Sequence, residues 1–259
     1  MPALLSVNIN KYALLRNSRG ANAPDLLQVV DVVLAAGAHG ITVHPRRDQR
    51  HVRLDDVPIL ARHLRDRHPG VELNIECEDH PSLVDLVLKV RPEQCTLVPV
   101  TPGELTSDHG WALPESRDRL LRATEQLVPA GIRVSCFADC EPERLAAFVD
   151  VGTHRGGAVH GPYAQAWGTV RQQEQVERFH ACAEAARAAG LGLNAGHDLD
   201  RHNLAGIRDA VGLAEVSIGH AQIVRALEVG TAQSVRELLA ALGWPTGAEV
   251  SAGSAAPAP

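Results

Sequence analysis

The chain has 259 residues, of which 45% are hydrophobic, so it is long enough to bury the core of one large domain or two small ones. Its formal net charge of -6 provides no large positive field, which argues against a nucleic-acid partner or an acidic membrane surface. No stretch reaches the ~20 apolar residues of a membrane span, and the N-terminus lacks the pattern of a secretion signal. We therefore expect a soluble, cytoplasmic protein.

The five cysteines are scattered and include no CxxC pair, which argues against a disulfide framework or a structural zinc site. We interpret them as reduced thiols. The 13 histidines are many for this length, but a histidine is more often a surface residue than a catalyst. Their positions relative to the predicted strands therefore decide which histidines are candidates for catalysis.

Short apolar runs, rich in β-branched residues, alternate along the chain with longer stretches of alanine, leucine and arginine. The runs predict strands at 4–9, 40–44, 71–76, 95–100, 132–137, 156–160, 191–196 and 214–219. Helices are predicted at 24–36, 55–68, 82–90, 115–130, 142–149, 165–189, 201–210 and, in two pieces around Gly230, at 221–242. The polar stretch at 10–20 is interpreted as the end of the first strand and not as a helix.

This alternation predicts an α/β fold, the (β/α)8 TIM barrel with extra helices. A doubly wound sheet is the alternative, but it would usually carry a glycine-rich phosphate loop where this chain has NINKYALLRNSRG. Residues 1–242 are expected to form a single catalytic barrel domain. Residues 243–259 are rich in alanine, proline, glycine and serine, so we expect a disordered tail there.

Polar residues gather at the predicted carboxyl ends of the strands, where barrel enzymes carry their chemistry. They are Asn8, Asn10, Lys11, His44, Arg46, His51, Glu76, His160, Asn194, His197, Gly219 and His220. A single histidine at the end of a strand is more often a surface residue than a catalyst. Loops that only close a barrel, however, have no structural reason to carry histidine, glutamate and arginine at so many strand ends on one rim. A glutamate and several histidines around one mouth can exchange protons near neutral pH, so the pattern predicts multi-step proton transfer.

Arginines near these strand ends, Arg19 and Arg46, can hold a phosphate or carboxylate through two hydrogen bonds. In SIGHAQIVRAL, Gly219 stands where a strand becomes a helix, and the bare N–H groups of that helix would suit a phosphate. A plain tight turn explains the glycine equally well. The sequence thus predicts anion binding beside the acid/base residues.

A metal ion among His44, Glu76, His160 and His197 is a further alternative. No HExxH or similar close ligand spacing is present, and arginines that hold phosphate fit poorly around a cation. We therefore expect neither a metal nor another cofactor at this site.

The chain resembles the pyridoxine 5'-phosphate synthase family from about Leu4 to Leu242. VNINKYALLRNSRG is similar to the family's VNIDHIATLRNARG-like opening, GITVHPRRDQRHV to its ITVHxRxDxRH stretch, and LNIE to its strand-three motif. LVPVTPGELTSDHGW resembles the loop after strand four, LNAGHDL the NAGHGL segment, and SIGHAQIVRAL the NIGHxxxxRA segment. These motifs follow one another in the family's order, which makes the resemblance specific.

The resemblance implies condensation of 1-deoxy-D-xylulose 5-phosphate with 3-amino-2-oxopropyl phosphate, releasing phosphate and water without metal or organic cofactor. It implies His44 and Glu76 as proton acceptors and His197 as the proton donor. By the same resemblance, the ketose phosphate would be held by Arg46, His51 and Thr106, and the aminoketone phosphate by Asn8, Arg19, Gly219 and His220. It also implies a homo-oligomer, an octamer in the family, in which Arg19 is lent to a neighbouring subunit.

Three departures from the family pattern fall at the same strand ends. Asn10 and Lys11 stand where the family has Asp-His, Asp198 replaces a glycine that faces the aminoketone phosphate, and Ala158 replaces a glutamate two residues before His160. A carboxylate near a phosphate is unfavourable unless neutralised. An amine partner without phosphate would tolerate Asp198, and a more anionic carbonyl partner would suit Lys11, although lysine can also form a Schiff base.

The departures leave open a relative that builds a different nitrogen heterocycle from altered substrates. A non-catalytic barrel that binds a phosphorylated metabolite is a second alternative, against which the joint presence of His44, Glu76 and His197 argues. An unrelated phosphosugar isomerase or aldolase is the third, and it would turn over a single sugar phosphate without an amine. In each case the expected partners are small molecules.

Overall fold

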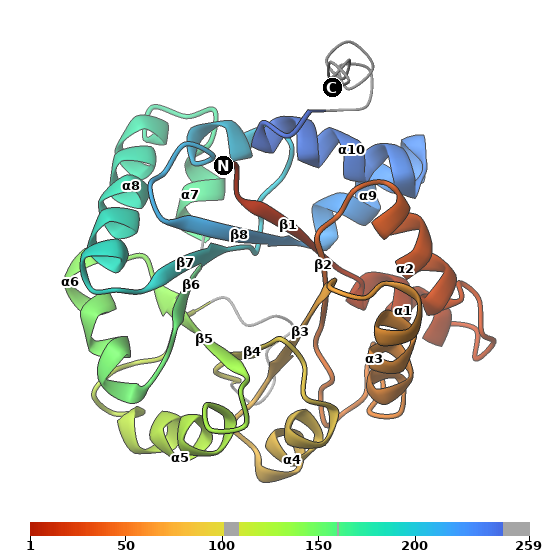
Figure 1. Cartoon of the computed structure of the whole chain (residues 1–259). Coiled ribbons are helices and arrows are strands. Elements are labelled where there is room, and N and C mark those ends of the chain that lie inside the picture. The colour runs from red at the N-terminus through yellow and green to blue at the C-terminus, as the bar shows by residue number, and fades with distance from the viewer. Residues whose placement is uncertain (101–108, 160, 246–259) are drawn as a thin grey trace, which may run out of the picture.

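The computed structural model describes residues 1–100, 109–159 and 161–245. Eight parallel strands close into a barrel in sequence order, each paired with the next and the last with the first (Figure 1). The strands are β1 (Leu4–Asn8), β2 (Gly40–Val43), β3 (Glu72–Cys77), β4 (Gln94–Leu97), β5 (Arg133–Asp139), β6 (Arg155–Val159), β7 (Gly192–Ala195) and β8 (Leu213–Ile218). The predicted barrel is confirmed, and all eight predicted strands are present.

Helices surround the barrel on its outer face (Figure 1). They are α1 (Asn10–Asn17), α2 (Leu26–Ala35), α3 (Asp56–Arg67), α4 (Pro81–Val90), α5 (Arg117–Leu127), α6 (Pro142–Leu145), α7 (Gly161–Ala166), α8 (Gln172–Ala188), α9 (His220–Val229) and α10 (Thr231–Leu242), with 3-10 turns η1 (Ala146–Val151) and η2 (Asn203–Gly206). None of the helices in the described part of the chain is long and apolar enough to cross a membrane.

Three helix predictions were wrong in detail. The stretch at 165–189 is two helices, because Gly168 adopts a left-handed φ of 76° between α7 and α8. The stretch at 201–210 forms only η2, because the Asp200 carboxylate accepts the backbone N–H groups of His202 and Asn203 and offers the chain a local alternative to a helix. The stretch at 142–149 begins as α6 but continues as η1.

The polar stretch after β1 was wrongly excluded from the helices. It forms α1, which begins at Asn10, where the side chain of Asn8 accepts the backbone N–H at 3.0 Å. Tyr12 and Arg16 are buried on one face, and Arg16 makes a two-point ion pair with Asp56 at the start of α3, with both N–O distances at 2.8 Å. Tertiary contacts therefore hold a helix that periodicity alone does not reveal.

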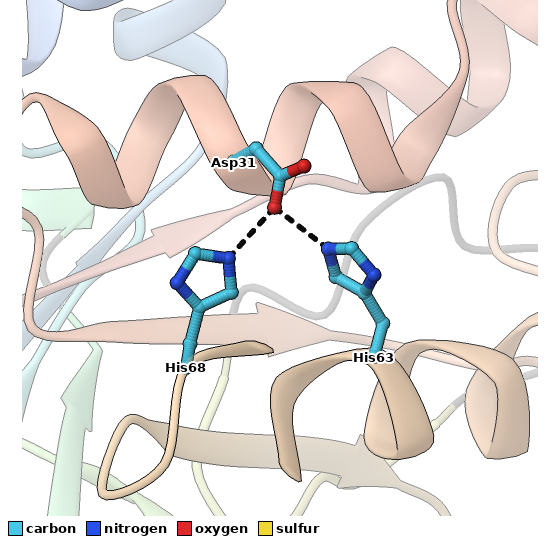
Figure 2. A group of neighbouring side chains, drawn as sticks. All are labelled: Asp31, His63 and His68. Atoms are coloured by element: carbon cyan, nitrogen blue, oxygen red, sulfur yellow. Dashed lines mark hydrogen bonds and ion pairs between the residues drawn. The ribbon is translucent and has the colours of Figure 1, made fainter. Parts of the chain in front are cut away.

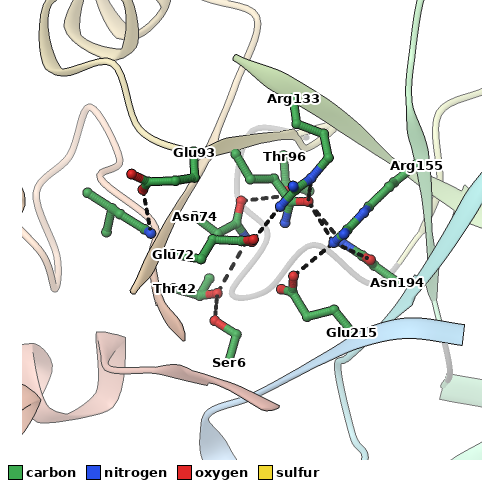
Figure 3. A network of polar contacts seen from close by, with 12 residues as sticks. Ser6, Thr42, Glu72, Asn74, Glu93, Thr96, Arg133, Arg155, Asn194 and Glu215 are labelled. Carbon is green, nitrogen blue, oxygen red and sulfur yellow. Dashed lines mark hydrogen bonds and ion pairs between the residues drawn. The ribbon is translucent and has the colours of Figure 1, made fainter. Parts of the chain in front are cut away.

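Side chains alternate along the strands, with a register irregularity at Leu193/Asn194, and the two faces differ in chemistry. Outward residues such as Leu5, Ile41 and Ile75 are fully buried against the helices and form the apolar core. Most inward residues are polar: Ser6 and Thr42 are hydrogen-bonded at 2.7 Å, and further polar residues of the interior continue the network (Figure 3). Polar groups, most of them hydrogen-bonded, therefore form the floor of any cavity above them.

The start and the end of the described chain meet. Helix α10 ends at Leu242, Gly243 follows with a left-handed φ of 89°, and the Trp244 indole then donates to the Ala3 carbonyl at 2.8 Å. The expected disordered tail lies mostly outside the described residues. The division of the chain at residue 242 therefore stays a prediction.

Candidate active site

A cavity of about 800 Å³ lies at the carboxyl ends of the strands, and all eight strands, or the residues just after them, contribute to its walls. It is lined by eleven of the predicted site residues: Asn8, Asn10, Lys11, His44, Arg46, His51, Glu76, His197, Asp198, Gly219 and His220. Arg19 does not line it and is exposed just beyond α1. Thr106 and His160 lie outside the described residues.

Glu76, the last glutamate of β3, points into this cavity, and its side chain is only 12% exposed. Burial raises the pKa of its carboxyl to about 7, and a weak hydrogen bond from the Asn8 amide to Oε2, at 3.3 Å, offsets only part of that shift. The carboxyl can therefore be present in both protonation states near neutral pH. It can accept a proton in one step of a reaction and return it in the next.

His44 follows β2 and faces Glu76, with 3.8 Å between its Nδ1 and the Glu76 Oε2. Burial, together with the charges of His51 and Arg46, lowers the pKa of His44 to about 3, so the ring is neutral at physiological pH. Among the described residues no group hydrogen-bonds to the buried His44 Nε2. A neutral imidazole with an unsatisfied nitrogen can form a hydrogen bond with a substrate in the cavity.

Arg46 and His51 form a polar wall beside this pair. The buried Nε of Arg46 has no hydrogen-bond partner in the described structure, and the Asp48 Oδ2 lies 3.7 Å away. The His51 Nδ1 accepts the backbone N–H of Val52 at 3.0 Å, which leaves Nε2 as the protonated nitrogen of the neutral ring. Burial and the Arg46 charge lower the pKa of His51 to about 4. The wall thus offers donors that suit an anion.

Two amides hold the ends of β1 and β2 together. Asn10, the first residue of α1, accepts the backbone N–H of His44 at 2.8 Å through its Oδ1, while Asn8 contacts both Asn10 and Glu76. These contacts help to fix the His44 backbone and the Glu76 carboxylate relative to the end of β1. Lys11, next on α1, is half-buried and adds a positive charge to the wall near His51.

His197 and Asp198 follow β7 at the opposite side of the lining. The His197 Nδ1 lies 3.2 Å from the Asp198 Oδ2, and the Asp198 side chain is half exposed. Asp198 has a left-handed φ of 70°, a conformation that glycine adopts freely and aspartate tolerates better than most residues. This backbone geometry accounts for the glycine of the family motif and shows how the aspartate can replace it.

The transition from β8 to α9 has the predicted geometry. Gly219 separates the strand from the helix and provides no side chain to cap the first N–H groups of α9. A Cβ at Gly219 would lie 3.0 Å from both the Cβ and the carbonyl oxygen of Asn8, so the glycine is needed for close packing of β8 against β1. The start of α9, at His220, therefore faces the cavity with N–H groups that favour an anion.

The sequence reasoning missed the charged floor beneath the cavity. Arg155 on β6 reaches across the barrel and donates from Nη1 to Gln94, Asn194 and Glu215 at 3.0–3.1 Å (Figure 3). Arg133 donates to Gln94 and forms an ion pair with Glu72. Burial raises the pKa of Glu215, which also lines the cavity. Alternating polar and apolar residues in ELNIE and AEVSI are the signal that could have indicated an inward polar set.

Comparison with known proteins identifies the family. A family model described as "Pyridoxal phosphate biosynthesis protein PdxJ" matches residues 5–243. The chain belongs to this family. It is 46% identical over 245 residues to the pyridoxine 5'-phosphate synthase of Albidiferax ferrireducens, covering 92% of this chain and 97% of that protein. The synthase of Mesorhizobium japonicum is 43% identical over 246 residues, covering 94% and 100%.

Solved structures share the barrel at low sequence identity. The tryptophan synthase A-subunit of Pyrococcus furiosus has a TM-score of 0.62 at 13% identity, covering 92% of this chain and 98% of that chain. Phosphoribosyl anthranilate isomerase of Thermus thermophilus has a TM-score of 0.58 at 12% identity, covering 93% and 98%. These likenesses support the (β/α)8 fold alone.

Proposed function

We propose that this PdxJ-family chain is a pyridoxine 5'-phosphate synthase, an enzyme that joins a ketose phosphate to an aminoketone phosphate and closes the pyridine ring by acid/base catalysis. The observation that carries the proposal is the facing pair of a neutral His44 and a Glu76 whose pKa is about 7, within one cavity. The names of the relatives and the match over nearly the whole chain support the same activity.

The chemistry requires repeated proton transfers at carbon, nitrogen and oxygen. An amine that condenses with a ketone loses water, and the adjacent carbon must then give up a proton before the next bond can form. Glu76 and His44 take such protons in our proposal, and His197 gives a proton to a departing hydroxyl. Glu76 suits several steps because its two protonation states lie close in free energy near neutral pH.

Two anion sites would hold the two phosphates on the cavity wall. We assign the ketose phosphate to Arg46 and His51, where buried donors are available, and Thr106 would join them. The aminoketone phosphate is assigned to Asn8, Gly219 and His220 at the start of α9. Phosphates fixed at both ends would keep the reacting carbonyl and amine close together.

The test is ring formation from the two phosphorylated substrates by the purified full-length chain. Glu76→Gln keeps the size and polarity of the side chain but cannot exchange a proton, so kcat should fall by about 10²- to 10⁴-fold. Glu228→Gln is the matched control, because Glu228 is exposed on α9 and pairs only with Arg225 among the described ion pairs. Turnover by Glu76→Gln at the control's rate would refute the proposed role.

A second candidate is favoured by Asp198, whose carboxylate stands beside His197 in the cavity lining. In this case the enzyme would take an aminoketone without phosphate, whose ammonium group Asp198 could hold. Competition between phosphorylated and unphosphorylated aminoketones discriminates the two candidates. A kcat/KM that favours the unphosphorylated amine, and that Asp198→Gly reverses, would support the second candidate and displace the first.

We further infer that the chain acts as a homo-oligomer in the cytoplasm, with the octamer of the family resemblance as the expected state. Leu15, on the same helix as the cavity-lining Leu14, is exposed, and Arg19 follows on the same surface segment. Exposed leucines beside an arginine suit a subunit contact. Light scattering gives the subunit number, and Arg19→Ala should raise the KM for a phosphorylated substrate if Arg19 serves a neighbouring site.

A further inference from the structure

Two histidines and an aspartate converge on the outer surface of the barrel, away from the cavity. Asp31 stands on α2, His63 on α3, and His68 directly after α3 (Figure 2). The Nε2 atoms of both rings lie 2.7 Å from the same Asp31 Oδ1. Within residues 1–100, 109–159 and 161–245, no other trio of His, Cys, Asp or Glu has its possible ligand atoms so close together.

The local structure explains the convergence of the two rings. On a continuous helix, residues five positions apart point about 140° away from each other, because the helix turns about 100° per residue. Helix α3 ends at Arg67, and His68 leaves it with φ -135° and ψ 57°. This turn brings the His68 ring back beside His63, with 5.6 Å between the ring centroids. Both rings then present the same nitrogen to α2.

The donor set has the chemistry of a site for a borderline divalent cation. Two imidazole nitrogens and a carboxylate oxygen are ligands that Zn²⁺ prefers, with a water in the fourth position. Ligand atoms about 2.0–2.1 Å from a tetrahedral Zn²⁺ lie about 3.3 Å apart. The three ligand atoms here lie within 4.8 Å of one another, and the two nitrogens are 2.7 Å from the oxygen. To admit the ion, each nitrogen–oxygen distance would lengthen by about half an ångström, and the two nitrogens, which lie within 4.8 Å of each other, would settle about 3.3 Å apart.

The exposure and the position of the three side chains also suit a bound ion. The side chains of His63 and His68 are 14% and 25% exposed, so packing limits their rotation, whereas Asp31 is 41% exposed and its carboxylate is open to an ion from solvent. The contacts of both rings with the same oxygen hold the Asp31 carboxylate between them.

We propose that Asp31, His63 and His68 bind one Zn²⁺-like cation that bridges α2 and α3. None of the three residues lines the cavity. His68 precedes β3, which begins at Glu72, so this cation site lies toward the amino ends of the strands, opposite the rim that carries Glu76. The ion would stabilise the contact between two neighbouring helices and take no part in the chemistry of the cavity.

The experiment uses full-length, tag-free protein freed of metal by chelator and dialysis. Zn²⁺ is titrated by calorimetry, and Co²⁺ is used as a spectroscopic probe of the ligands. We expect binding of one ion with nitrogen and oxygen ligation, and we expect Asp31→Asn, His63→Gln and His68→Gln each to weaken binding by about 10- to 100-fold or more. Anomalous diffraction from a Zn²⁺-soaked wild-type crystal should place the ion between the three side chains.

Two controls separate this site from other possible ligands. His80→Asn removes an imidazole that caps α4 and replaces it with another capping side chain, so it should leave Zn²⁺ affinity unchanged. Cys140→Ser removes one of two thiols whose sulfur atoms lie 2.8 Å apart. A sulfur-to-cobalt charge-transfer band that Cys140→Ser abolishes, or equal Zn²⁺ affinity in wild type and Asp31→Asn, would overturn the proposal. If a histidine variant does not fold, Asp31→Asn and the wild-type crystal still decide the question.

Discussion

The raised pKa of Glu76 predicts that its ionised carboxylate lowers the stability of the fold. The pKa is about 7 in the folded protein, against an ordinary value of 4.5. The folded chain therefore binds the Glu76 proton more tightly than the unfolded chain does. Stability should fall as pH rises from 4.5 to about 7 and should stay lower above that range. At about 1.36 kcal/mol per pKa unit, the full effect is roughly 3 kcal/mol.

Glu76→Gln removes this titration while keeping the side chain's size. Relative to wild type, the variant should gain about 2.5 kcal/mol in the free energy of unfolding between about pH 5 and pH 8, because part of the wild-type loss has already occurred at the lower pH. Urea denaturation at both pH values, at one fixed protein concentration, measures this difference and cancels any constant effect of the amide. Glu228→Gln provides the control on an exposed glutamate.

A difference of less than about 1 kcal/mol between the two pH values would refute the reasoning, because it would mean that Glu76 titrates normally in the folded state. The same carboxyl should control catalysis. As the proposed base it acts when ionised, so wild-type kcat/KM should rise with pH through about 7. The stability experiment is independent of turnover and tests the physical cause, which is burial of the Glu76 carboxyl, offset in part by the Asn8 amide.

Two further substitutions test the walls and the floor of the cavity. Gly219→Ala places a Cβ 3.0 Å from Asn8, so it should destabilise the fold by about 1–3 kcal/mol, as measured by denaturation. It should also raise the KM for a phosphorylated substrate in steady-state kinetics. Arg155→Met leaves the buried Glu215 without its cation and should lower the free energy of unfolding by roughly 3 kcal/mol. Adding Glu215→Gln should restore part of this loss. As a control, Arg144→Met, at an exposed arginine, should change the free energy of unfolding by less than about 0.5 kcal/mol.

The strand order and the rim residues could be predicted because both follow from local patterns. Apolar runs between helices indicate strands, and parallel strands joined by helices place all their carboxyl ends on one side. His44, Glu76 and His197 therefore had to lie on the same rim. The side-chain pairings did not follow, because the contact between His44 and Glu76 depends on how Asn10 and Asn8 join their strand ends.

Local sequence patterns could not predict helix α1 or the cluster of Asp31, His63 and His68, because both depend on contacts between distant segments. The polar surface of α1 gives little periodic signal, and its stability depends on Arg16 reaching Asp56, forty residues away. His63 and His68 have a spacing that would separate them on a regular helix, and only the turn at His68 brings both to Asp31. Contacts of this kind require the packed arrangement of α2 and α3 before they can be recognised.

The two glutamates of β3 show how the two ends of the barrel interior differ. Glu72 and Glu76 are separated by one inward residue, Asn74, so all three side chains point into the barrel interior. At the amino end, Arg133 pairs with Glu72 and continues into the buried network of the floor. At the carboxyl end, the Asn8 amide is the only hydrogen-bond donor to Glu76 in the described part of the chain, and no described cation offsets the effect of burial on its pKa.

The same strand therefore carries one glutamate that is paired with an arginine and one that can gain or lose its proton near neutral pH. Placing an arginine beside Glu76 would fix its charge and remove the ability to exchange a proton near neutral pH. The cavity lies where the interior network lacks a cation for the carboxylate, and its other unsatisfied groups, at Arg46 and His44, face the same space. The two ends of the strand thus differ physically: the floor glutamate is paired with Arg133, whereas the burial of Glu76 at the mouth raises its pKa to about 7.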